Sequence, residues 1–96
     1  MASVDIFSNK KTDGVGTAQT NSGASIAVYA ISLKGNLDGA FVDVLIDLSG
    51  GSDYVVAGTL SHHNRTRLIM IPAGAQVNAK LSGARTSTKV TVTLAS

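Results

Sequence analysis

Residues 40–60, AFVDVLIDLSGGSDYVVAGTL, decide the fold, because they hold two apolar runs separated by the turn-like segment SGGSD. In the first run, Val42, Val44, Ile46 and Leu48 fall on one side, while Phe41, Asp43, Leu45 and Asp47 fall on the other. This period of two is typical of a β-strand with one dry face and one mostly wet face. The second run places Tyr54, Val56, Gly58 and Leu60 together. Glycine pairs supply the positive φ that tight hairpins require, so the stretch predicts a central β-hairpin.

Strand-like runs also lie on both sides of this hairpin. Residues 25–34, SIAVYAISLK, are apolar on both faces, as expected for a strand inside a sheet or between layers. Residues 76–81 and 88–94 alternate between apolar and polar side chains, and in residues 65–71 Arg65 and Arg67 share a side with Ile69 and Ile71, while Leu68 and Met70 take the other. We therefore predict an all-β fold, a small antiparallel β-sandwich or barrel of about six to eight strands. The alternative is a single open sheet that is completed only in an oligomer.

The first 24 residues differ in composition from the rest of the chain. They are mostly small and polar, with Val4, Ile6 and Phe7 as the one bulky apolar cluster. Such a segment buries too little surface to hold itself in place. It is either a loose terminus or an extended arm whose apolar anchors dock as an added strand on this subunit or a neighbouring one. We accordingly divide the chain into an N-terminal arm, residues 1–24, and a β-sandwich domain, residues 25–96.

Length and composition restrict the class of protein. Ninety-six residues form one small domain, and the absence of cysteine excludes disulfides and thiolate metal sites. There is no apolar run of about 20 residues and no secretory signal pattern, which favours a protein that folds in a cytoplasm. Residues 1–53 carry a net charge of −3 and residues 54–96 a net charge of +5. This asymmetry indicates either cross-strand pairing of acidic and basic strands or a bipolar surface that docks on a partner.

No motif for catalysis or for metal binding is complete. His62 and His63 are adjacent and would point to opposite sides of an extended chain, so they are poorly placed to share a metal ion. A triad of Ser61, His62 and Asp53 lacks the sharp glycine-framed turn of a serine nucleophile. Asp43 and Asp47 would lie roughly 13 Å apart on one strand, too far for a glycosidase pair, and their expected role is solvation of an outer face.

Phosphate and nucleic-acid sites are equally incomplete. The glycine pairs lack the lysine and the helix start of a phosphate-binding loop. No aromatic residue is interleaved with the basic residues of the second half, as single-strand binding requires. We expect a protein that is not an enzyme, with no cofactor, no metal, no nucleic-acid partner and no membrane span.

Turn motifs at several positions give the chain a family resemblance. They are SLKG at residues 32–35, GA at 39–40, DLSGGSD at 47–53, PAG at 72–74 and SG at 82–83. Over residues 31–94, about two-thirds of the chain, this order resembles short β-sandwich virion proteins of tailed bacteriophages. The chain departs from their pattern at Tyr54, where they usually have tryptophan, and at residues 48–51, which replace an Asp-Gly-Gly form.

The resemblance implies a capsid decoration (cement) protein, located on the virion surface after synthesis in the cytoplasm of the bacterial host. Its partner would be the major capsid protein, and it would be a homo-oligomer, either a trimer or a dimer. The candidate contacts are the arm anchors Val4, Ile6 and Phe7, and the polar residues Arg65, Arg67 and Arg85 facing an acidic capsid surface. The alternative is a glycan- or receptor-binding module of a tail or fibre, which would expose Tyr29 or Tyr54.

Overall fold

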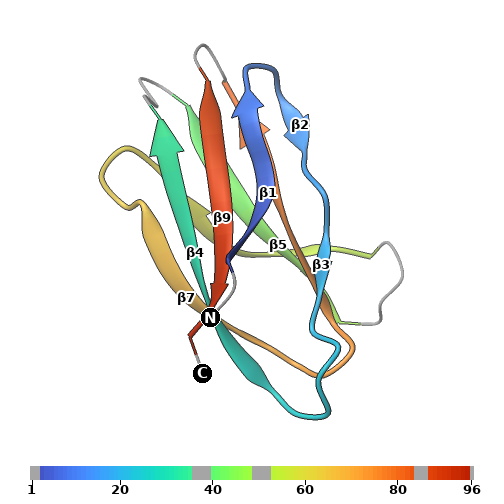
Figure 1. The fold of residues 1–96 in the computed structure, drawn as a ribbon. Coiled ribbons are helices and arrows are strands. Elements are labelled where there is room, and N and C mark those ends of the chain that lie inside the picture. The colour runs from blue at the N-terminus through green and yellow to red at the C-terminus, as the bar shows by residue number, and fades with distance from the viewer. Residues whose placement is uncertain (1–2, 36–39, 49–52, 84–86, 96) are drawn as a thin grey trace.

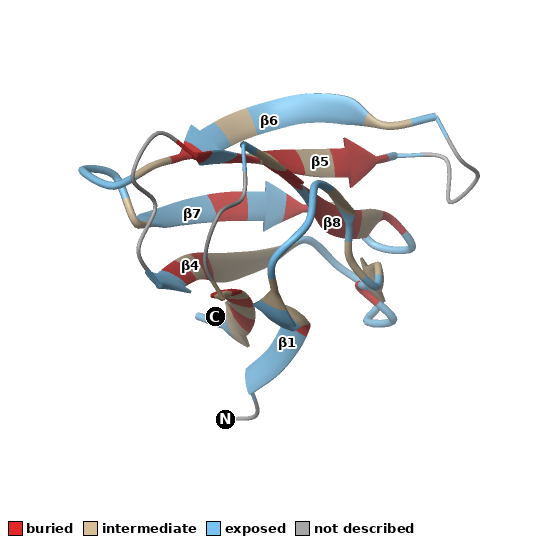
Figure 2. Ribbon diagram, turned by 90° about the horizontal axis from the view of Figure 1, so that it is seen from above, coloured by how far each residue is buried: buried red, intermediate tan, exposed pale blue. Residues whose placement is uncertain are grey.

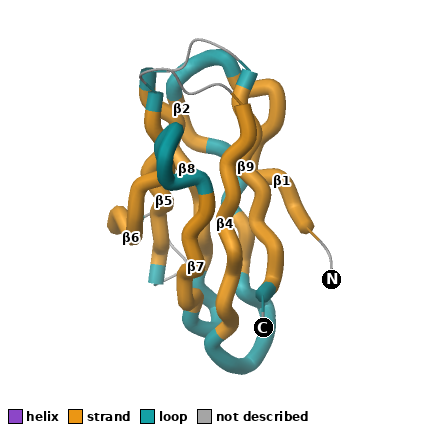
Figure 3. Tube along the Cα trace, turned by 90° about the vertical axis from the view of Figure 1, so that its left-hand side faces the viewer, coloured by secondary structure: helices purple, strands orange, loops and turns teal. Residues whose placement is uncertain are grey.

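The computed structural model describes residues 3–35, 40–48, 53–83 and 87–95, and these residues form nine strands. Within these ranges there is no helix, and therefore none that could cross a membrane (Figure 3). The strands are β1 (Ser3–Lys10), β2 (Gly14–Val15), β3 (Gln19–Thr20), β4 (Ala27–Gly35), β5 (Phe41–Asp47), β6 (Val55–Leu60), β7 (Thr66–Ile71), β8 (Gln76–Ser82) and β9 (Thr88–Leu94).

The strands form two antiparallel sheets that pack face to face (Figure 1). The first sheet has the order β1-β9-β4-β7, and the second has the order β2-β8-β5-β6, with β3 also paired to β8. The predicted all-β sandwich is confirmed, and the alternative of a single open sheet is wrong. The predicted hairpin is also present, since β5 pairs with β6, although its turn residues 49–52 lie outside the described residues.

The core lies between the two sheets and follows the sequence alternation closely. Buried apolar side chains come from both inner faces. Figure 2 shows buried residues, in red, along much of β5 and β8. They include Ile31 and Leu33 of β4, Val42, Val44 and Ile46 of β5, Val77, Ala79 and Leu81 of β8, and Val90 and Val92 of β9. Burial of alternate residues from facing sheets supplies the main stabilising term in such a fold.

Two residues of the hairpin differ from the predicted faces. Leu48 follows the end of β5 and is 64% exposed, whereas Asp47 is fully buried rather than solvated as expected. The Tyr54 hydroxyl donates a hydrogen bond to Gln76 Oε1 at 3.1 Å, and Gln76 is the residue that pairs with Asp47. Tyr54 thus reaches across the outer face of the sheet over the position of Asp47. Asp47 is therefore buried on the outer face of the sheet, next to this bonded pair of side chains.

The second run of the hairpin also departs from the predicted alternation. The register between β5 and β6 shifts between Val44 and Leu45, because Gly58 pairs with Val44 whereas Val56 pairs with Leu45. Ala57 is the extra residue of this bulge, and a bulge reverses the side to which the preceding residues point. Val56 is therefore 60% exposed while Leu60 is fully buried, so these two residues do not share a face as predicted.

Residues 3–21 belong to the sandwich of the same chain. Strand β1 pairs with β9 at the edge of the first sheet, and β2 and β3 pair with β8 in the second. Of the two interpretations of the N-terminal segment, the added strand on this subunit describes this arrangement. Ile6 is 2% exposed in the core, and Phe7 packs against it. Strands from the N-terminal segment therefore pair with both sheets formed by the rest of the chain.

Asn21 fastens this segment to the turn between β7 and β8. Its side-chain Nδ2 donates to the carbonyl oxygens of Ile71 at 2.8 Å and Ser25 at 3.0 Å. Its backbone N–H donates to Ala75 O at 2.9 Å, and its own carbonyl accepts from Gly74 N at 2.8 Å. The residue is 4% exposed, so these bonds are shielded from water and losing them leaves buried groups unpaired.

We predict that Ile6→Ala lowers the free energy of unfolding by about 2–5 kcal/mol, because it leaves a cavity between the sheets. Val4→Ala, on the same strand but 44% exposed, should lower it by less than about 1 kcal/mol. Urea unfolding of the two variants measures the difference. Equal losses would show that β1 does not hold the position described.

Replacing Asn21 tests the second attachment. Asn21→Ala should cost about 1–3 kcal/mol of unfolding free energy, since the carbonyls of Ile71 and Ser25 each lose a hydrogen bond from the Asn21 amide. Asn21→Asp should cost a similar amount because a carboxylate has no hydrogen to donate. Asn64→Ala, at an exposed turn position, serves as the control in the same unfolding assay. The attachment is refuted if all three variants unfold like the unmodified protein.

Candidate interaction surface

Strand β7 forms one edge of the first sheet, and it is the only regular edge among the described strands. Its register with β4 runs without a shift from Thr66 to Ile71. Two register shifts interrupt β1, one interrupts β6, and β2 and β3 have two residues each. Proteins commonly blunt an edge strand with bulges or shortness, because a straight edge invites pairing with another chain. Three of the sandwich edges are blunted in this way, and β7 is not.

The backbone groups on the free side of β7 follow from its pairing with β4. Leu33 N donates to Arg65 O at 2.8 Å, which fixes which residues of this ladder bond to each other. Since bonding alternates along an antiparallel pair, residues 67, 69 and 71 bond to β4, and Thr66, Leu68 and Met70 turn their N–H and C=O groups away from it. No described strand pairs with that second side of β7.

The outer face of the same strand is apolar. Leu68 and Met70 are each 68% exposed, the highest values among the exposed large apolar residues. They stand opposite Ala30 and Val28 on β4, both half-buried, so the apolar stripe continues onto the neighbouring strand. Isolated exposed apolar side chains are ordinary, whereas a stripe over two adjacent strands is typical of a contact surface.

Arg67 lies on the inner side of this edge and reaches over β6. A Cβ atom added to Gly58 would lie 2.7 Å from Arg67 Cδ, so the glycine makes room for the arginine stem. The side chain is exposed, and no carboxylate of the described residues lies within ion-pair distance of it. Arg67 is thus a cation held at the free edge without an acidic partner in this part of the chain.

Arg65 has a different environment, at the start of the same strand. Its guanidinium donates to Gly35 O at 2.9 Å and to His62 O at 3.1 Å, and it lies 3.0 Å from His62 Nδ1. These contacts join the turn before β7 to the end of β4. Arg65 therefore has a structural role in the described residues, and Arg67 is the more available of the two arginines.

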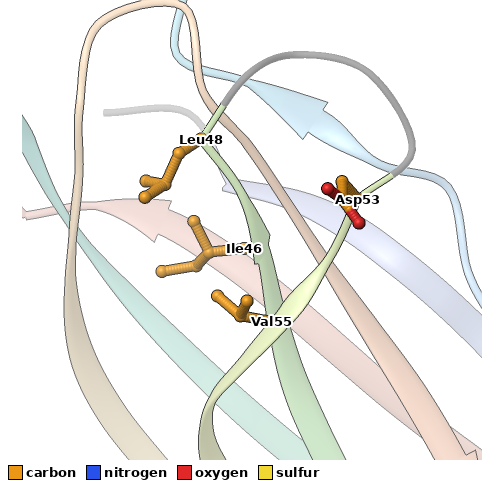
Figure 4. A pocket seen from close by; sticks show the side chains of 4 residues that line it. All are labelled: Ile46, Leu48, Asp53 and Val55. Carbon is orange, nitrogen blue, oxygen red and sulfur yellow. The ribbon is translucent and has the colours of Figure 1, made fainter.

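A hollow of about 220 Å³ lies where β5 ends and β6 begins. It is lined by Ile46, Leu48, Asp53 and Val55. Figure 4 shows the three apolar side chains pointing to one side, with Asp53 on the opposite side. Leu48 and Val55 are more than half exposed. Among the described residues the lining consists of three apolar side chains and one carboxylate, and several converging polar groups, which are typical of a small-molecule site, are not found in this part of the chain.

The predicted contact residues do not form one surface. Val4, Ile6 and Phe7 lie on β1, whereas Arg65 and Arg67 lie at β7, which is the opposite edge of the same sheet. Arg85 lies outside the described residues. Lys10 Nζ stands 5.9 Å from the centre of the Phe7 ring, so a basic residue covers the exposed part of that aromatic side chain. The structure separates the proposed anchors from the proposed basic contacts.

The residues weighed for catalysis and metal binding are also dispersed. Asp53 and Ser61 lie at opposite ends of β6, roughly 20 Å or more apart for an extended chain. His62 and His63 are exposed in the turn after it, with ring centres 5.0 Å apart and edge-on. The described residues contain no group of three potential metal ligands.

The two tyrosines that a glycan site would expose are half-buried. Tyr29 packs against the core, and Tyr54 is bonded to Gln76.

The charge asymmetry of the sequence corresponds in part to cross-strand pairing. Lys89 Nζ lies 3.6 Å from Asp5 Oδ2 across β9 and β1. Asp43 stands opposite Lys80 in the β5–β8 ladder, and its Oδ1 accepts a hydrogen bond from Thr59 at 3.0 Å. Acidic residues of the first half of the chain therefore face basic residues of the second half.

Comparison with known proteins identifies no relative: no protein-family model, no curated protein and no solved structure matches this chain.

Sequence reasoning missed the outer face of β7. The run RTRLIMI places Leu68 and Met70 opposite the arginines, and the core-facing pair Ile69 and Ile71 is apolar as well. A strand that is apolar on both faces was a signal available from the sequence. It can indicate either a central strand or an edge strand with a contact surface, and only the pairing order distinguishes the two.

We predict that Leu68→Ala and Met70→Ala each change the free energy of unfolding by less than about 0.5 kcal/mol, because both side chains are largely in water. Ile69→Ala, between them on the same strand and 9% exposed, should cost about 2–5 kcal/mol. Thermal or urea unfolding compares the three variants. A large loss from Leu68→Ala or Met70→Ala would mean that this face is covered in the isolated protein.

Proposed function

We propose that the chain is a non-enzymatic structural protein of a bacteriophage virion, a decoration protein that binds the assembled head and stabilises it. The observation that carries the proposal is the uninterrupted, apolar edge strand β7 in a sandwich whose other described edges are interrupted or very short. The resemblance of residues 31–94 to tailed-phage virion proteins supplies the identity of the partner, which we propose is the major capsid protein.

Such a protein acts through its contacts. A ligand that binds only the assembled shell stabilises that shell by mass action, without any reaction. The described residues bring together an apolar stripe, free backbone groups and the cation Arg67, all on β7. Ile6 is enclosed in the chain's own core, so the proposal places the principal contact on β7 and not on β1. We further propose a symmetric homo-oligomer, a dimer or trimer, on the capsid surface.

A glycan- or receptor-binding module of a tail or fibre is the alternative from another class. It needs an exposed aromatic platform, and Tyr29 and Tyr54 are both half-buried. No observation on the described residues favours it over the decoration protein.

The proposal predicts that the chain is a component of virus particles. An antibody raised against the purified protein is applied to particles banded from induced cultures of the organism that carries the sequence, by immunoblot and by immunogold electron microscopy. Labelling of heads is expected. Labelling confined to tails or fibres would support the alternative, and particles that lack the protein would contradict a virion role.

A further inference from the structure

We propose that β7 binds, by strand addition, an extended segment of a partner protein that places an acidic residue beside Arg67. In β-augmentation, main-chain hydrogen bonds hold the added strand while alternate side chains give specificity. The inference rests on the proposed function only for the partner's identity as a capsid protein. The mode of binding rests on the geometry of β7.

The backbone of β7 offers three positions to an added strand. Thr66, Leu68 and Met70 direct their N–H and C=O groups to the free side, as the alternation from the Leu33–Arg65 bond requires. Six consecutive residues lie in unbroken register, a length typical of strands in globular proteins. An added strand would extend the first sheet from four strands to five and would satisfy these groups.

The side chains of β7 define what the added strand should carry on each face. On the outer face, apolar residues would continue the stripe formed by Leu68 and Met70. On the inner face, the residue opposite Arg67 would meet a guanidinium that has no carboxylate partner among the described residues. Opposite charges on directly facing residues stabilise a strand pair, so the fitting residue is aspartate or glutamate.

Arg67 also argues against a second copy of this chain as the occupant. Strand β7, TRLIMI, contains no acidic residue. In any antiparallel pairing of β7 with itself, the residue facing Arg67 must share its face, and it is therefore Ile69, Ile71 or another Arg67. Each of these leaves the guanidinium without a counter-charge, and an inward-pointing charge at an edge is a known protection against self-pairing. A partner that supplies a carboxylate is the one that this edge fits.

Two peptides test the inference without the natural partner. Acetyl-GTVTVETG-amide places valines opposite Leu68 and Met70 and glutamate opposite Arg67 in antiparallel register, and acetyl-GTVTVKTG-amide replaces the glutamate with lysine. Backbone amide shifts of the ¹⁵N-labelled protein are followed during titration to millimolar concentration. We expect the amides of Thr66, Leu68 and Met70 to shift most. The glutamate peptide should bind about threefold more tightly, a typical value for an exposed charge pair.

The variant Arg67→Gln should remove the preference for glutamate while leaving binding through the backbone. No shift on β7 with either peptide, larger shifts on β1 or β6, or equal affinity of the two peptides for the unmodified protein would each overturn the inference.

A proline blocks the edge selectively. Leu68→Pro removes an N–H that points to the free side, so it should leave the ladder to β4 intact and abolish peptide binding. If that variant does not fold, Leu68→Lys places a charge in the outer stripe and should weaken binding at least tenfold. Val56→Lys is the matched control, since Val56 is an exposed apolar residue of β6, an edge strand of the second sheet. Equal losses from Leu68→Lys and Val56→Lys would contradict docking on β7.

The same variants separate this inference from the proposed function. If the unmodified protein rebinds heads from which it has been removed, Leu68→Lys should fail to rebind and Val56→Lys should rebind. Rebinding by both variants would leave the decoration role standing and overturn the β7 inference. If the unmodified protein does not bind heads, the decoration role fails, and the peptide titration still decides the inference. A dimer that Leu68→Lys converts to a monomer would assign β7 to a second copy and refute the acidic partner.

Discussion

The unpaired backbone groups at the edges of the two sheets are the constraint on which this structure depends. A sandwich of two short sheets has edges that must be closed, blunted or used. In this chain two register shifts interrupt β1, and β6 carries a bulge at Ala57. Beside β8, the edge consists of two separate short strands, β2 and β3. Each device removes the regular row of donors and acceptors that another chain could pair with. Strand β7 keeps that row of donors and acceptors. Because it lies at the edge of its sheet, β7 is the strand with which another chain can pair.

The N-terminal segment contributes strands to both sheets of the sandwich. One stretch of polypeptide supplies β1 to the first sheet and β2 and β3 to the second, so residues 3–21 cover β9 and β8 in turn. Ile6 enters the core from this segment, and Gly16 passes so close to it that an added Cβ would meet Ile6 Cγ2 at 2.5 Å. Asn21 then ties the segment to the turn that follows β7. The small polar residues of this region permit the close approach, which is why composition alone resembles a loose terminus.

The sequence predicted the fold class and most of the core, because alternation along a strand reports burial directly. Val42, Val44, Val77 and Val90 all face the interior as their spacing indicated. It did not predict the reversal at Ala57, since a bulge depends on pairing with a neighbour, or the burial of Asp47, which depends on tertiary surroundings that alternation along one strand does not report. It also did not locate the contact surface. Edge and central strands can share one pattern, and only the order of strands shows that β7 ends its sheet.

Residue-resolved amide hydrogen exchange in the isolated protein tests the central claim most directly, because exchange reports which N–H groups are bonded. If β7 is a free edge, the amides of Thr66, Leu68 and Met70 exchange rapidly while those of residues 67, 69 and 71 are protected by β4. This alternation within one strand would establish an open docking edge. Uniform protection of all six amides at low protein concentration would contradict it, since that would mean that the outer side of β7 is already covered.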